Sequence, residues 1–188
     1  LSAMHMQAGN DAKALAALES AYNLGMLTEA AELQRLANYL AFAGIPHRAA
    51  RVMEKAMKEG QIESSAANYK TLANYWHQAK ELDPAIDTLA KSYQLAPSAE
   101  LQLKMARMMI QSKRYKDLVA LAAKPAANAS GEQRADLKFL TGVAYFEQQK
   151  PKEALSAFTQ AAQNGNVSGR ASPWISFLKE QQGGAVTQ

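Results

Sequence analysis

Two series of positions, occupied almost throughout by small residues, run along this chain at a constant separation. The first series is Ser2, Ala37, Ala73, Ala106 and Gly142, and the second lies 12 residues later each time, at Ala14, Ala49, Ala85, Leu118 and Ala154. Both series advance in steps of 35, 36, 33 and 36 residues. A period of this size is typical of stacked helical hairpins, in which small residues let paired helices approach closely. The spacing therefore predicts an all-α array of five hairpins.

Prolines support this register because they fall where second helices should begin. Pro46, Pro84 and Pro151 suit the first turn of a helix, where no backbone N–H is needed. We expect a single array over 1–182, with hairpins at about 1–29 (truncated), 30–65, 66–98, 99–134 and 135–168. A capping helix is expected at 172–182, with Ser172 as N-cap and Pro173 as first residue, before a flexible tail at 183–188.

The first hairpin is predicted to be incomplete. Leu1 falls in the middle of what should be its first helix. An open end of a hairpin array exposes apolar surface, so we expect further repeats to precede Leu1 in a longer protein.

The third and last units share a further pattern of aromatic and small residues. The third unit places an aromatic residue, leucine, alanine and tryptophan on its first helix and closes with proline, at Tyr69, Leu72, Ala73, Trp76, Ala85, Leu89, Ser92 and Pro97. The last unit carries Gly142, Tyr145, Ala154, Phe158 and Ala161 at the matching positions. Both units resemble the tetratricopeptide repeat (TPR). This resemblance implies a right-handed TPR superhelix, an α-solenoid of helix-turn-helix hairpins, that binds other proteins.

A narrower resemblance covers several segments of the chain. Residues 39–55, 60–63 and 72–76 resemble TPR proteins of proteobacteria that are encoded beside TonB, ExbB and ExbD, and the match continues through 140–146 to Trp174. The resemblance implies a periplasmic accessory to TonB-dependent uptake of the iron or siderophore type, with TonB, ExbB or ExbD components as partners. A cytoplasmic location is the alternative.

Few residues point to catalytic or metal chemistry. The chain has no cysteine, and its three histidines, His5, His47 and His77, show no ligand spacing. Hydrolase, P-loop and dinucleotide-binding motifs are missing from the sequence, and its net charge of +4 includes no basic block that would suggest a nucleic-acid partner. No run of about 18 apolar residues occurs. We therefore expect no enzyme activity, no cofactor and no metal.

First helices of successive hairpins are expected to line a concave groove in which a peptide docks. Because Leu72 and Trp76 should face the core, the helical period turns the intervening polar positions toward this groove. The expected partner-binding residues are Gln34, Asn38, Lys70, Asn74, His77, Arg107 and Gln111. The resemblance implies a carboxylate clamp at the Lys70–Asn74 spacing, but Gln34 replaces the lysine of the preceding unit. A polar lining for an extended peptide is favoured, and a merely solvated helix face is the alternative.

The sequence thus predicts a non-enzymatic scaffold for protein–protein interaction. An assembly factor for another cell-envelope complex and a cytoplasmic chaperone-like adaptor are alternatives within the same class. An enzyme whose site no motif reveals and a homo-oligomeric spacer are alternatives from other classes.

Overall fold

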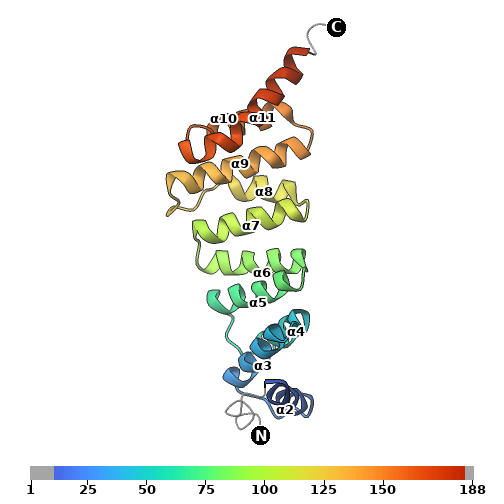
Figure 1. The fold of residues 1–188 in the computed structure, drawn as a ribbon. Helices are drawn as coiled ribbons and strands as arrows, with labels where there is room; N and C mark the ends of the chain where they lie inside the picture. The colour runs from blue at the N-terminus through green and yellow to red at the C-terminus, as the bar shows by residue number, and fades with distance from the viewer. Residues whose placement is uncertain (1–10, 185–188) are drawn as a thin grey trace. The chain divides into compact units, whose positions relative to one another are not determined.

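The computed structural model describes residues 11–184, and every regular element in this range is an α-helix (Figure 1). The chain divides into two compact units, residues 1–95 and 96–188. The single array expected over 1–182 stays a prediction. The expected first helix of the first hairpin, with Ser2, lies outside the described residues, as do residues 185–188 of the expected tail.

The first unit is a stack of helical hairpins. Its helices are α2 (Asp11–Asn23), α3 (Ala30–Phe42), α4 (Pro46–Lys58), α5 (Ala66–Gln78) and α6 (Leu82–Leu95). The pairs α3–α4 and α5–α6 form hairpins, α2 packs on α3, and α4 packs on α5. The small positions are buried where these helices meet, with at most 1% of each side chain exposed at Ala14, Ala37, Ala49, Ala73 and Ala85.

The second unit repeats this arrangement. Its helices are α7 (Ala99–Gln111), α8 (Tyr115–Ala122), α9 (Gly131–Glu147), α10 (Pro151–Ala161) and α11 (Gly165–Gly184). The pairs α7–α8 and α9–α10 form hairpins, α9 packs on both α7 and α8, and α11 closes the stack against α9 and α10. Phe158 is fully buried in an apolar cluster that includes Val167, Ala171 and Leu178 of α11.

Serine caps or prolines mark the starts of six of the described helices. Ser65, Ser98 and Ser130 each accept a hydrogen bond from the backbone three residues on, and at Ser130 the Gln133 side chain completes a capping box. Pro46 and Pro151 open α4 and α10, and Pro84 lies in the first turn of α6. The predicted role of these prolines is confirmed.

Two expected boundaries are wrong. The fourth unit ends at Ser130 and not at residue 134, because the capping box starts α9 at Gly131. The final helix begins at Gly165 and not at Ser172, because the Asn164 side chain accepts from the Asn166 N–H and caps the helix there. Ser172 instead donates to the Ser168 carbonyl inside α11, which continues past Pro173 to Gly184. Residues 183 and 184, expected in the flexible tail, are therefore helical.

Candidate protein-binding surfaces

The groove residues expected in the first unit lie on α3 and α5. Gln34 Nε2 donates to Asn68 Oδ1 at 3.3 Å, and the Tyr75 hydroxyl donates to Asn38 Oδ1 at 2.6 Å. These hydrogen bonds join α3 to α5. The two amides therefore stabilise the contact between these helices while remaining partly or fully exposed to solvent. The remaining three residues are half-buried, and each interacts with another group: Lys70, Asn74 and His77.

Tyr75 is a buried polar residue at the contact between α3 and α5 that the sequence prediction missed. Its side chain is only 5% exposed, and burial raises the pKa of its hydroxyl above the ordinary value. Its position three residues after Leu72 places it on the same side of α5, which is the signal that could have revealed it.

The expected residues of the second unit, Arg107 and Gln111, are exposed on α7. The Arg107 guanidinium lies 3.7 Å from the Asp136 carboxylate of α9, and Arg170 of α11 pairs with the same carboxylate. Asp136 thereby links three helices of this unit. Five of the expected residues lie in the first unit and two lie in the second. Neither unit by itself contains the whole expected set, so the concave groove stays a prediction.

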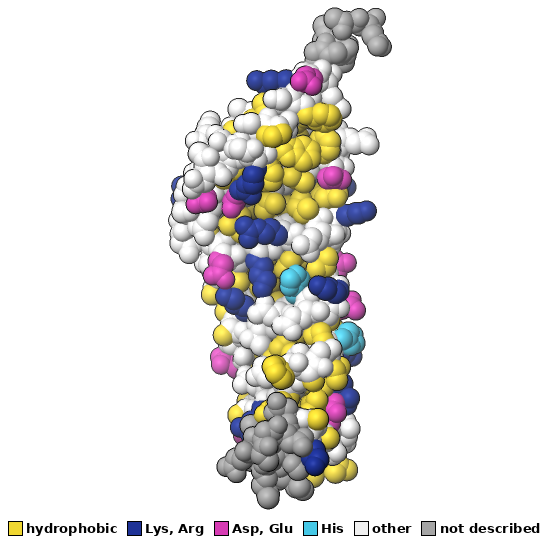
Figure 2. Space-filling view, viewed as in Figure 1, with side chains coloured by type: hydrophobic (Ala, Val, Ile, Leu, Met, Phe, Trp, Pro, Cys, Tyr) yellow, Lys and Arg dark blue, Asp and Glu magenta, His cyan; other side chains and the backbone are white. Residues whose placement is uncertain are grey.

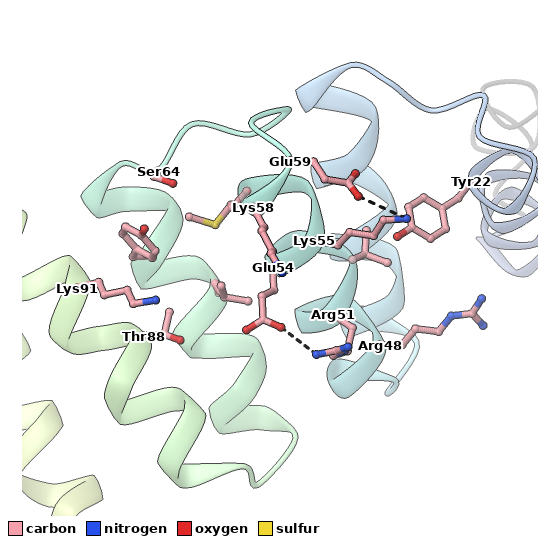
Figure 3. A pocket seen from close by; sticks show the side chains of 14 residues that line it. Tyr22, Arg48, Arg51, Glu54, Lys55, Lys58, Glu59, Ser64, Thr88 and Lys91 are labelled. Atoms are coloured by element: carbon pink, nitrogen blue, oxygen red, sulfur yellow. Dashed lines mark hydrogen bonds and ion pairs between the residues drawn. The ribbon is translucent and has the colours of Figure 1, made fainter.

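A different surface, a groove between α4 and α6, opens in the first unit (Figure 3). α5 separates the two helices, and its Tyr69 and Leu72 contribute to the base, while Tyr22 of α2 closes one end. The groove has a volume of about 970 Å³, at the upper end of the range for ligand sites. We call it the α4–α6 groove.

The α4–α6 groove has an apolar floor and a charged rim. Val52, Met57 and Leu72 of the floor are at most 7% exposed. The rim carries five basic side chains, Arg48, Arg51, Lys55, Lys58 and Lys91, and two acidic ones, Glu54 and Glu59. The difference is three positive charges, against a net charge of +4 for the whole chain.

Weak contacts hold most of the rim cations. Three take part in exposed or partly exposed ion pairs, Arg48–Glu19 at 2.7 Å, Arg51–Glu54 at 3.0 Å and Lys55–Glu59 at 3.9 Å. Two ammonium groups lie over aromatic rings, Lys55 at 5.7 Å from the Tyr22 centroid and Lys91 at 5.6 Å from that of Tyr69. Figure 3 shows Lys58 and Lys91 on opposite sides of the opening.

The sequence held a signal for this groove that the prediction did not use. Arg48, Arg51, Lys55 and Lys58 are spaced by three, four and three residues, which places them along one side of a helix. The prediction assumed docking on first helices, whereas α4 is a second helix.

The second unit has a related groove between α8 and α10, with a volume of about 460 Å³. Its base is formed by Lys138, Thr141 and Tyr145 of α9, as α5 forms the base of the α4–α6 groove. Its charged lining residues are Lys138, Lys152 and Glu153, a difference of one positive charge. The two grooves thus share a position between second helices but differ in charge.

Apolar side chains also gather on the second unit, over the part of it that α9 and α11 form (Figure 2). There Phe146, Pro173, Trp174 and Phe177 line a shallow recess. The rings of Trp174 and Phe177 lie 5.0 and 6.1 Å from that of Phe146, both edge-on.

Neither a metal-binding cluster nor a membrane-spanning helix occurs in the described part of the chain. In residues 11–184, no three histidine, cysteine or acidic side chains are grouped so that they could hold a metal ion. None of the helices in this range combines the length and the apolar character needed to cross a membrane.

Comparisons with solved structures identify the fold. A crystal structure of MamA is 16% identical, with a TM-score of 0.57, over 90% of this chain and 97% of that one. The C-terminal part of a TPR repeat-containing protein from Cytophaga hutchinsonii is 11% identical, with a TM-score of 0.63, over 100% of this chain and 72% of that one. No family model and no curated protein sequence matches the chain. The predicted all-α solenoid is confirmed, and its fold is that of tetratricopeptide-repeat proteins.

Proposed function

We propose that this chain is a non-enzymatic scaffold that binds other proteins. The observation that carries the proposal is the α4–α6 groove, an open cleft with an apolar floor and a charged rim built from three hairpins' helices. Apolar burial supplies affinity and charged groups at the edge supply selectivity, a combination typical of protein-binding surfaces. The TPR-like fold supports the same function by analogy.

The lining of the groove favours binding over catalysis. Its carboxylates, Glu54 and Glu59, form ion pairs with Arg51 and Lys55, an arrangement typical of a charged binding rim. These groups supply attachment points for a partner's side chains.

Site-specific photo-crosslinking in cells tests the scaffold function. A benzophenone amino acid is placed at one of three positions. Ser64 lies on the edge of the groove, Asn74 is a predicted binding residue of α5, and Gln94 is an exposed control. We expect discrete adducts with another protein at Ser64 or Asn74 and none at Gln94. If every position yields only the uncrosslinked chain, the scaffold proposal is wrong.

The binding residues that the sequence predicts on α5, Lys70, Asn74 and His77, have their own test. Lys70→Glu should leave folding intact. It should lower the affinity for an acidic or carboxylate-bearing partner whose adduct forms at Asn74. If affinity for that partner is unchanged, Lys70 is not part of the binding surface.

We further propose that the partner belongs to a TonB-dependent uptake system in the periplasm. The support is the sequence resemblance over residues 39–55, 60–63, 72–76 and 140–146. Cell fractionation and mass spectrometry of the Ser64 adduct test both parts. Recovery of the chain in the cytoplasmic fraction, or an adduct with a different envelope complex, would favour the alternatives.

A further inference from the structure

We propose that the α4–α6 groove binds an extended acidic peptide segment in which apolar residues alternate with carboxylates. The inference rests on the proposed scaffold function and adds the chemistry of the partner. It concerns a surface between second helices, not the first-helix face that the sequence predicted.

The charge of the rim selects for carboxylates. Five basic side chains line the groove with two acidic ones, and Glu19 pairs with Arg48 from outside the lining, which leaves an excess of two positive charges. Among residues 11–184, neither Lys58 nor Lys91 has an ion-pair partner, and both are exposed. The Arg51–Glu54 and Lys55–Glu59 pairs are exposed, and exposed pairs contribute little, so an incoming carboxylate can share these cations at small cost.

The floor calls for apolar side chains between those carboxylates. Around the buried Val52, Met57 and Leu72, the half-buried rings of Tyr22 and Tyr69 also line the groove, and a fully charged ligand would leave this apolar surface uncovered. Successive side chains of an extended peptide point in opposite directions, so alternate residues reach the floor while the others face the rim. A volume of about 970 Å³ suits a segment of several residues better than a single small anion.

Two features favour a protein segment over a nucleic acid. The Lys55 and Lys91 ammonium groups lie over one face each of Tyr22 and Tyr69, where a stacked base would otherwise lie. Glu54 and Glu59 stand among the cations and would repel a continuous phosphate backbone, whereas separate carboxylates can avoid them.

Fluorescence polarisation with a defined probe tests the inference. The probe is a labelled peptide of alternating glutamate and leucine, compared with the same peptide carrying glutamine for glutamate. We expect the glutamate peptide to bind at least about tenfold more tightly, as expected for charge-assisted contacts, and to lose affinity as salt is raised.

Charge reversal locates the binding. The double variant Lys58→Glu/Lys91→Glu should bind the glutamate peptide at least about tenfold more weakly than the unmodified chain. The matched control, Lys138→Glu/Lys152→Glu, makes the same change in net charge at the groove of the second unit and should alter affinity by no more than about twofold. Circular dichroism melting curves confirm that both variants are folded.

Three results would overturn the inference. The first is undetectable binding of the glutamate peptide, and the second is an equal loss of affinity for it in both double variants. The third is tighter binding of single-stranded RNA or phosphatidylserine vesicles than of the peptide, measured in parallel. Photo-crosslinking at Ser64 separates this failure from that of the scaffold function. Protein adducts without affinity for the glutamate peptide would reject only the acidic segment.

Discussion

At the scale of single residues, Gly142 of α9 packs tightly against the Phe158 ring of α10. A Cβ added at Gly142 would lie 2.7 Å from the Cδ1 and Cε1 atoms of the Phe158 ring. Phe158 is fully buried, so its ring has no free space to move into. We expect Gly142→Ala to lower the free energy of unfolding by about 1–3 kcal/mol, measured by urea denaturation.

Gly169 provides the matched control for this substitution. It also lies inside a helix, α11, but a Cβ there meets no atom within 4 Å. Gly169→Ala should therefore raise the free energy of unfolding by about 0.5–1 kcal/mol, because alanine loses less backbone entropy than glycine. An unchanged midpoint for Gly142→Ala would refute the close helix contact that the small-residue series predicts.

The hydrogen bond from Tyr75 to Asn38 predicts a pH dependence of stability. Burial raises the pKa of Tyr75 above the ordinary value of 10.0, so the folded state holds this proton more tightly than the unfolded state. The stability linked to this proton is complete below about pH 10 and is lost as the pH rises through the raised pKa. Tyr75→Phe should cost about 1 kcal/mol below that range.

Urea denaturation at neutral and alkaline pH checks this prediction. The difference between the wild type and Tyr75→Phe should shrink once the pH exceeds about 10, since the phenylalanine cannot ionise. A constant difference across the range would show that burial of Tyr75 does not control its ionisation.

At the scale of elements, the turns inside the hairpins repeat as regularly as the helices. Gly44, Lys80, Lys113 and Gln149 all have positive φ, between 58° and 79°, and each follows its small first-helix residue by seven positions. Glycine adopts this conformation without strain, whereas lysine and glutamine do not. Only Gly44 carries a sequence signal for this conformation. For the other three turns the sequence predicts the position along the chain but not the positive φ.

These turns yield a paired prediction. Lys113→Gly should relieve strain between α7 and α8 and raise the free energy of unfolding by about 0.5–1 kcal/mol, whereas Gly44→Ala should lower it by about 1 kcal/mol. Thermal melting of both variants gives the measurement. Destabilisation by Lys113→Gly would mean that the lysine side chain outweighs the strain of its backbone.

The helices themselves were predictable because their signals are local. Buried alanines at a fixed period and prolines at helix starts placed α4 and α10 within the correct hairpins. The start of α11 was missed because Ser172-Pro173 is a common helix start, whereas the Asn164 cap and the buried Val167 and Ala171 extend the helix upstream. The α4–α6 groove was missed because it depends on four helices, α2, α4, α5 and α6, that the sequence places but does not orient.

At the scale of the whole molecule, each compact unit contains one of the two tryptophans. In the first unit, Trp76 is 5% exposed and meets His47 edge-on at 5.4 Å. In the second unit, Trp174 stacks on Phe158 at 5.2 Å. Tryptophan fluorescence therefore reports on each unit once the other tryptophan is replaced by phenylalanine.

The final prediction concerns how far a local change spreads through this molecule. The stability of a hairpin array is approximately the sum of its repeats and their nearest-neighbour contacts, so a defect should act most strongly on its own unit. In a Trp76→Phe background, Gly142→Ala should lower the urea midpoint that Trp174 reports. In a Trp174→Phe background, the same change should lower the midpoint that Trp76 reports by less. The indole N–H of Trp76 is buried without a hydrogen-bond partner among the described residues, so Trp76→Phe breaks no hydrogen bond there. Equal shifts of the two midpoints would instead show that residues 1–95 and 96–188 unfold as one cooperative body.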